Sequence, residues 1–131
     1  AIFTCAAIES ASVTADASTS NVWRFLFQRR PKVGPQNILA RHGLELIFIF
    51  GTLTDIPLVQ IQQEDLDLSE RMMQAWINFA TTGDPNNTQT PNAWTAYDAQ
   101  KDPTWLFDVK DSLKEGVRKD RCTFWKNLTS P

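Results

Sequence analysis

Several residue types on which common catalytic and binding functions depend are scarce in this sequence. Its 131 residues include one histidine, two cysteines and five glycines. One histidine and two cysteines far apart in the chain cannot form a zinc site, and no carboxylates have the spacing of a calcium loop. The glycines form no phosphate-binding loop. We therefore expect no metal ion and no cofactor.

An excess of charge of one sign is also lacking. Thirteen basic and fifteen acidic residues give a net charge of −2, which argues against a nucleic-acid partner, because such proteins carry a concentrated positive excess. The basic residues between positions 24 and 41 are interrupted by apolar residues and prolines, and we interpret them as a solvated edge. They are Arg24, Arg29, Arg30, Lys32 and Arg41.

Long apolar runs are missing too. No uninterrupted apolar segment approaches the ~20 residues that a membrane span needs, and no signal-peptide pattern opens the chain. We interpret the first residues as typical of the interior of a longer protein. Because 42% of the residues are hydrophobic, we expect residues 1–131 to build one core, without a linker or a repeat.

The sequence lacks the parts of a complete serine hydrolase. No glycine pair flanks a serine in a Gly-x-Ser-x-Gly elbow, and no Gly-Gly pair is available for an oxyanion hole. No pair of carboxylates stands out for glycoside hydrolysis either. We therefore expect this chain to be inactive as a serine hydrolase on its own.

The single histidine lies in an informative setting. His42 precedes Gly43, and a mostly apolar run over residues 44–50 follows directly. This arrangement predicts an imidazole at the rim of a buried core. Because histidine exchanges protons near neutral pH, His42 is the first candidate for a general base. The alternative is a loop histidine that only satisfies a backbone hydrogen bond.

The two cysteines lie near the two ends of the chain. In a reducing compartment, Cys5 and Cys122 would be small buried hydrophobic residues. In a secreted protein, a bond between them would close nearly the whole chain into one loop. Such a loop would stabilise the fold by about 4–5 kcal/mol through the entropy of the unfolded chain. Two glycosylation sequons, at Asn86 and Asn127, favour secretion.

Hydrophobic periodicity predicts the secondary structure in outline. Residues 21–28 are expected to form a strand, because Trp23, Phe25 and Phe27 alternate with residues of the other face. Residues 44–50 fit either a buried strand or a short core helix, since periodicity cannot separate these in so short a run. The other expected elements are a helix over 3–13, a loop over 84–92 anchored by Trp94 and Tyr97, a strand over 104–109 and a helix over 117–128.

The clearest element is a helix over residues 62–81. An apolar stripe at helical spacing predicts the face that packs in the core, and we interpret it as packing rather than a cofactor site. Gly83, followed by Pro85, ends the helix. The stripe consists of Leu68, Met72, Met73, Trp76, Phe79 and Ala80, and the residues expected to face water are Glu64, Asp65, Asp67, Glu70 and Arg71.

Six motifs follow one another along nearly the whole chain. They are Phe3-Thr4-Cys5, Val22-Trp23-Arg24-Phe25, His42-Gly43-Leu44-Glu45-Leu46 with Phe48-Ile49-Phe50-Gly51, Leu68-Ser69…Met72…Trp76…Phe79-Ala80…Gly83-Asp84-Pro85-Asn86, Trp94…Tyr97, and Cys122-x-Phe124-Trp125. In this order they resemble the C-terminal region of the type B carboxylesterase/lipase family, the α/β-hydrolase group that includes cholinesterases and many fungal esterases.

This resemblance implies an α/β fold in which a mostly parallel sheet is flanked by helices. Residues 1–131 would be the C-terminal part of a single α/β-hydrolase domain, incomplete on its own. The resemblance also implies that Cys5 pairs with Cys122, and that Gly43 and Glu45 have structural or supporting roles beside the histidine. For residues 44–50 it favours a short helix or an irregular turn.

The activity implied is carboxylic-ester hydrolysis through a Ser-His-Glu/Asp triad and an acyl-enzyme intermediate. His42 would be the catalytic base, and the serine and the acid would lie in the N-terminal part of the same enzyme, which would be the partner of this chain. A small-molecule or lipid ester would be the substrate, and the protein would be secreted. Two alternatives stay open: a non-catalytic adhesion or binding homologue of the same fold, and a free-standing interaction domain.

Overall fold

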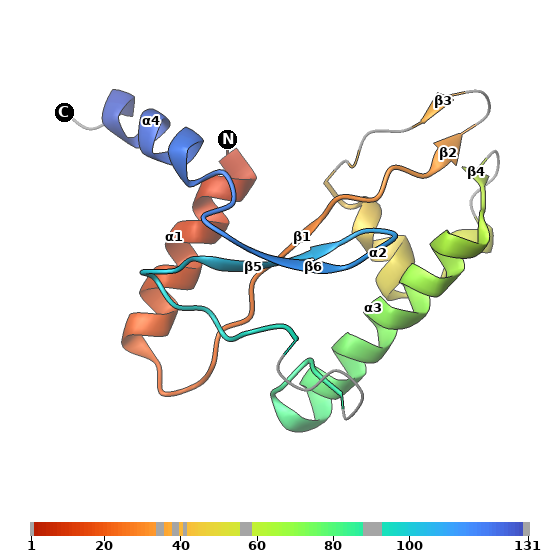
Figure 1. Ribbon diagram of the computed structural model, residues 1–131, viewed down its shortest axis with the longest axis horizontal. Coiled ribbons are helices and arrows are strands. Elements are labelled where there is room, and N and C mark those ends of the chain that lie inside the picture. The colour runs from red at the N-terminus through yellow and green to blue at the C-terminus, as the bar shows by residue number, and fades with distance from the viewer. Residues whose placement is uncertain are drawn as a thin grey trace.

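The computed structural model of the chain describes residues 2–33, 36–37, 40, 42–55, 59–87 and 93–129. Helices and strands alternate irregularly along it (Figure 1). In chain order the elements are α1 (Ile2–Ala17), β1 (Phe25–Phe27), β2 (Lys32–Val33), β3 (Gln36–Asn37), α2 (Leu44–Ile49), the 3₁₀ turn η1 (Leu53–Asp55), β4 (Val59–Gln60), α3 (Gln63–Thr82), β5 (Pro103–Phe107), β6 (Ser112–Glu115) and α4 (Lys119–Thr129).

The main sheet has the strand order β1-β5-β6. β1 runs parallel to β5, with Phe25 opposite Trp105 and Phe27 opposite Phe107, whereas β6 runs antiparallel to β5. The described part of the sheet is therefore mixed, where a mostly parallel sheet was expected. A second small sheet, of order β3-β2-β4, is antiparallel throughout.

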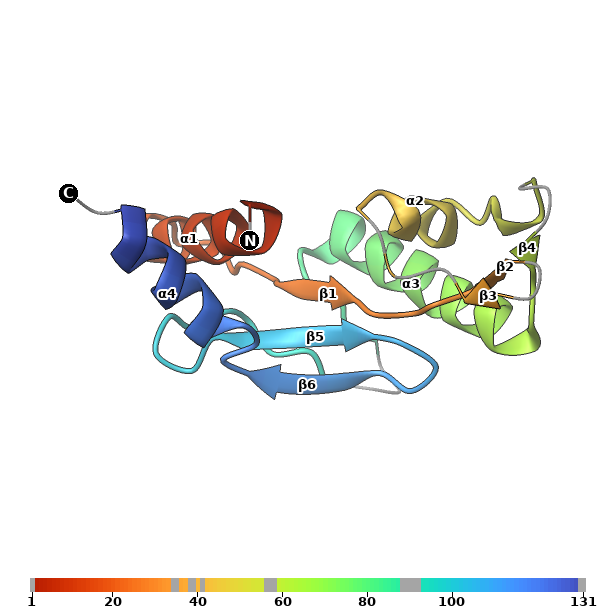
Figure 2. The ribbon, with the colours of Figure 1, turned by 90° about the horizontal axis from the view of Figure 1, so that it is seen from above.

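The helices gather at the two ends of the main sheet. Helices α2 and α3 lie together at one end and α1 and α4 at the other, in both views of the ribbon (Figures 1 and 2). The core lies between the sheet and the α2–α3 pair, where Phe25 packs edge-on against Trp76 at 5.0 Å and Phe27 lies 4.9 Å from Phe48. Burial of these large rings is the main force that holds the strands against α3.

Helix α3 confirms the predicted helix with bounds one residue later at each end. Gly83 ends it in the left-handed conformation, at φ 77°, and its N–H donates to the Phe79 carbonyl at 2.8 Å. Leu68 and Met72 are fully buried, as expected. Two predictions about the faces of the helix are wrong, because Phe79 and Ala80 are exposed and Asp65 is 0% exposed.

The expectation that the basic segment forms a solvated edge is wrong for Arg24 and Arg29. Arg24 is buried and forms an ion pair with the buried Asp102 of the neighbouring strand region. Arg29 Nε donates to Asp65 Oδ1 at 2.6 Å, which explains how a carboxylate on α3 is buried. Arg30 and Lys32 are exposed, as expected, and Arg41 lies outside the described residues.

The remaining outline agrees with the sequence in most places. α1, β1, β5 and α4 confirm the expected helices and strands, and Trp94 and Tyr97 are buried as the anchors of their loop, of which residues 88–92 lie outside the described part. α2 confirms the helix that the family resemblance favoured for residues 44–50. β6 and the three strands of the small sheet were not predicted. No helix in the described ranges is long and apolar enough to cross a membrane.

Candidate active site

The chain turns sharply at Gly43 to pass from the histidine loop into α2. Gly43 has φ 87°, in the left-handed region that residues with a Cβ rarely adopt, and it directly precedes the helix. Empty space surrounds the position that a Cβ would occupy, so the requirement for glycine comes from the backbone and not from crowding. This turn fixes His42 just outside the first turn of α2.

The imidazole of His42 is exposed and stacks on an aromatic ring from a different part of the chain. The ring centroids of His42 and Phe3 lie 4.2 Å apart, with 16° between the ring planes. Phe3 belongs to the first turn of α1. No described residue forms a hydrogen bond or ion pair with the imidazole, so its nitrogens are available to groups outside this part of the chain.

A wide hollow of about 1010 Å³ opens beside the imidazole. His42 and Glu45 line it together with Phe3 of α1 and all three residues of β1. In the described chain β1 pairs with β5 alone, so its second edge has no partner strand here. The hollow therefore joins a titratable ring to an open sheet edge.

Glu45 lies in the first turn of α2 and is half-buried. Its place on the wall of the same hollow suits a supporting role, and a carboxylate near the beginning of a helix is favoured by the helix dipole. The described residues supply an exposed imidazole and a carboxylate on the wall of the same hollow. They contain neither a serine elbow nor an oxyanion hole, so they do not make a complete hydrolytic site.

A disulfide joins the two terminal helices, α1 and α4. Cys5 of α1 and Cys122 of α4 are bonded, with 5.3 Å between their Cα atoms, which confirms the pairing that the resemblance implied. A side-chain hydrogen bond of 3.0 Å from Arg118 Nη1 to Thr4 Oγ1 lies beside it. The beginning of α1 is thus attached to the beginning of α4.

Comparison with known proteins assigns the chain to a family. The model of the carboxylesterase family matches residues 1–125. The chain belongs to the carboxylesterase family. It is 30% identical to acetylcholinesterase 1 of Caenorhabditis elegans over 95% of its length, and 32% identical to the para-nitrobenzyl esterase of Bacillus subtilis over 85%. It spans 22% and 23% of these two relatives.

Solved structures agree with this assignment. A thermophilic PNB esterase superposes with a TM-score of 0.75 and 28% identity, over 86% of this chain and 23% of that one. Another PNB esterase gives a TM-score of 0.72 at 29% identity, over 86% and 22%. This carboxylesterase-family chain therefore has part of an α/β-hydrolase fold.

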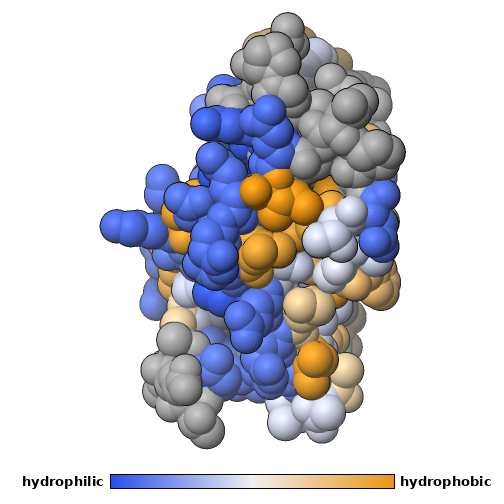
Figure 3. All heavy atoms as spheres, turned by 90° about the vertical axis from the view of Figure 1, so that its right-hand side faces the viewer, coloured by the Kyte–Doolittle hydropathy of each residue, from blue (hydrophilic) through white to orange (hydrophobic). Residues whose placement is uncertain are grey.

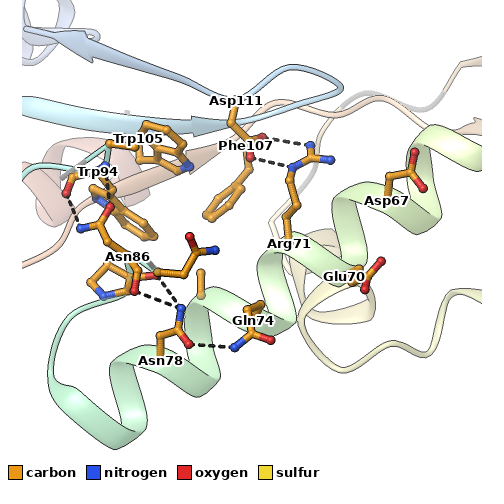
Figure 4. A pocket seen from close by; sticks show the side chains of 14 residues that line it. Asp67, Glu70, Arg71, Gln74, Asn78, Asn86, Trp94, Trp105, Phe107 and Asp111 are labelled. Carbon is orange, nitrogen blue, oxygen red and sulfur yellow. Dashed lines mark hydrogen bonds and ion pairs between the residues drawn. The ribbon is translucent and has the colours of Figure 1, made fainter. Parts of the chain in front are cut away.

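The two sequons of this carboxylesterase-family chain lie in different surroundings. The Asn86 amide is occupied: Nδ2 donates to Asp84 Oδ1 at 2.7 Å and to the Trp94 carbonyl at 2.8 Å, and Oδ1 accepts the Trp94 N–H at 2.9 Å (Figure 4). Asn127 is exposed on α4. Of the two amides, the one at position 127 is the more accessible for a glycan.

A second hollow, of about 610 Å³, lies between α3 and β5 (Figure 4). Arg71 crosses one side of it, with its Nε 2.9 Å from Asp111 Oδ2, and Trp94 and Trp105 lie on the other. No local pattern predicted this hollow, because its wall comes from four separate segments. His42 does not line this second hollow. The larger hollow, which the exposed imidazole of His42 lines, is therefore the candidate active site.

Proposed function

We propose that this chain is the histidine-bearing part of a serine carboxylic-ester hydrolase. The observation that carries the proposal is the exposed imidazole of His42 just before α2, which lies on the wall of a hollow and has no hydrogen-bond or ion-pair partner within the described residues. Membership of the carboxylesterase family supports it. Since the histidine comes last of the three in the chain order of this fold, the serine and the acid would lie upstream of His42.

In the proposed reaction His42 acts twice as a proton carrier. It takes the proton from a serine hydroxyl as the serine oxygen attacks the ester carbonyl carbon, and it gives that proton to the alcohol oxygen that leaves. It then takes a proton from water, whose oxygen attacks the acyl-enzyme, and returns the proton to the serine. The imidazole carries each proton only while it lies within hydrogen-bond distance of both oxygens.

We propose that the serine, the acid and the oxyanion hole belong to an upstream part of the same enzyme. Two features of the chain support a missing neighbour. One edge of β1 has no partner within the described residues, and unpaired strand edges are normally covered or blocked. Large apolar side chains are also exposed, and Figure 3 shows an apolar area at the α2–α3 end of the molecule.

The decisive experiment replaces His42 in the whole protein that contains this chain. His42→Ala is expected to lower kcat for a simple ester by at least about 10⁴-fold, because the base is lost while binding groups remain. Added imidazole is expected to restore part of the activity. Leu46→Ala, which truncates an exposed side chain on α2, is the control for damage to the helix. Near-normal activity of His42→Ala would overturn the proposal.

Fluorophosphonate labelling separates the enzyme from a binding protein of the same fold. In the natural material we expect mass spectrometry to find a larger upstream segment that carries one probe adduct and stays with this chain. An unlabelled upstream segment would favour the non-catalytic adhesion or binding role. This chain alone is expected to take no label, since it lacks a serine elbow.

We also propose that the protein is secreted. The Cys5–Cys122 bond supports this, because structural disulfides persist in oxidising compartments. The exposed Asn127 provides an accessible sequon. Peptide mapping of the natural protein is expected to find the disulfide intact and a glycan at Asn127; free thiols at both cysteines would contradict the proposal.

A further inference from the structure

The stacked pair of Phe3 and His42 joins α1 to the turn that precedes α2, two segments that lie far apart in the sequence. The rings lie 4.2 Å apart at 16°, so one face of the imidazole is covered by a flat hydrocarbon surface. Despite this contact Phe3 is 64% exposed. Within the described residues, this ring contact is the only interaction seen for the imidazole.

Phe3 is held in place by the attachment of α1 to α4. Cys5, two residues along the helix, is bonded to Cys122, and the intervening Thr4 accepts a hydrogen bond of 3.0 Å from Arg118. α1 shows no comparable polar or covalent tie to α2 in the described chain. The place of the Phe3 ring above His42 therefore depends on residues 3–5 being held against α4.

We propose that Phe3 is a positioning residue for His42, and that the Cys5–Cys122 disulfide holds Phe3 where it can stack. This inference rests on the proposed role of His42 as the base. A histidine on a loop has two free side-chain torsions, and its rate falls when its nitrogens leave the line between serine and leaving group. Stacking restricts both torsions while leaving the ring nitrogens open at the edge.

The first test compares ring and non-ring substitutions of Phe3 in the whole protein. Phe3→Leu keeps an apolar side chain but removes the flat ring, and we expect kcat to fall about 3- to 10-fold with KM unchanged, which corresponds to the contribution of one aromatic pair. Phe3→Tyr keeps the ring and is expected to retain the wild-type kcat. Phe3→Met is a second non-ring variant should Phe3→Leu be produced poorly.

The control is Phe124→Leu, which makes the same change at an exposed ring on α4. In the described part of the chain the Phe124 ring contacts Trp125, and it does not line the hollow beside His42. We expect Phe124→Leu to keep the wild-type kcat. Equal losses in Phe3→Leu and Phe124→Leu would mean that damage to the α1–α4 pair, and not the stack, lowers the rate, and would overturn the inference.

The second test links the disulfide to the stack. The double variant Cys5→Ser/Cys122→Ser is expected to lower kcat by a factor similar to Phe3→Leu, measured at a temperature where it stays folded. Adding Phe3→Leu to it is expected to cause no further fall, because the stack is already lost. If the fold-changes in kcat multiply in the triple variant, the disulfide and Phe3 act independently, and the proposed link between them is overturned.

His42→Ala separates failure of this inference from failure of the proposed function. If His42→Ala keeps its activity, His42 is not the base and the proposed function fails. If His42→Ala is inactive while Phe3→Leu has the kcat of Phe3→Tyr, only the positioning role fails. A rise in KM without a change in kcat would place Phe3 against the substrate and would also overturn it.

Discussion

The two ends of the molecule are held together by different means. At the α2–α3 end, large side chains such as Phe48, Leu68 and Met72 are fully buried, and a carboxylate is buried with its arginine. At the α1–α4 end, rings such as Phe3 and Phe124 are exposed, and the helices are joined by a disulfide and one side-chain hydrogen bond. Packing holds the first pair of helices, and a covalent bond holds the second.

This difference bears on how the candidate active site is organised. His42 directly precedes Gly43 and α2, which belongs to the packed end, whereas Phe3 belongs to the end that depends on the disulfide. Buried packing fixes the backbone that carries the imidazole, because interiors respond to changes of even one methylene. The position of the Phe3 ring depends on how firmly α1 is attached to α4. Buried packing therefore holds the backbone of His42, whereas the disulfide-bonded helix α1 holds the ring that covers it.

Removing the buried carboxylate of α3 is expected to have the largest effect on the packed end. In Asp65→Ala the Arg29 side chain, which is 13% exposed, loses its carboxylate partner, and the Gln62 N–H loses the acceptor that it now has at 2.9 Å. Stripping one member from a buried ion pair costs about 3–5 kcal/mol in unfolding free energy. Chemical unfolding of the whole protein measures the change.

Asp67→Ala is the matched control, because it makes the same substitution on the same helix at an exposed position. Asp67 accepts one side-chain hydrogen bond from Gln63, four residues earlier, so a loss of about 0.5 kcal/mol or less is expected. Equal losses in the two variants would show that burial does not distinguish the two carboxylates.

The loop that follows α3 is expected to belong to the packed end as well. Asn78→Ala leaves the Pro85 and Asn86 carbonyls without its amide, but Asn86→Ala removes three hydrogen bonds of a half-buried amide at once. We expect Asn86→Ala to lower the unfolding free energy by about 1–3 kcal/mol, because the Trp94 N–H loses its acceptor. Thermal unfolding of protein produced in bacteria, where no glycan is attached, measures the loss.

Asn127→Ala is the control for that variant. Asn127 is exposed on α4, and a surface substitution of this kind changes the unfolding free energy by about 0.5 kcal/mol or less. A large loss in Asn127→Ala would show that the α1–α4 end is packed more firmly than its exposed rings indicate.

Local patterns in the sequence predicted the elements that have strong periodicity. α3, with its apolar stripe and terminal Gly83, needed no tertiary information, and neither did the alternating aromatic residues of β1. The histidine loop was singled out by the rarity of its residue and the glycine that follows. The disulfide came from the family resemblance, because spacing alone left both redox states open.

Long-range pairing between polar residues could not be predicted from those patterns. Arg24 and Asp102 are far apart in the sequence, and the residues around each of them predict an exposed charge. The same holds for Arg29 and Asp65, whose burial becomes acceptable only when the two meet. The stack of Phe3 on His42 could not be predicted for the same reason, since the two residues lie far apart in the sequence.

Near the α1–α4 end, beside the Arg24–Asp102 ion pair, we expect the smallest effect, and it depends on pH. Burial raises the pKa of the Tyr97 hydroxyl above its ordinary value, and the negative charge of Asp102 adds to the shift. Between the unfolded pKa, near 10, and the higher folded pKa, the native state binds more protons than the unfolded state, so stability falls as the pH rises through this window.

Tyr97→Phe has no proton to lose, and its unfolding free energy is expected to decline less steeply above pH ~10. Measuring both proteins at pH 7 first removes the constant cost of the missing hydroxyl. Parallel declines above pH ~10 would mean that the Tyr97 hydroxyl is as accessible to water in the folded protein as in the unfolded chain, and that the packing around it is open.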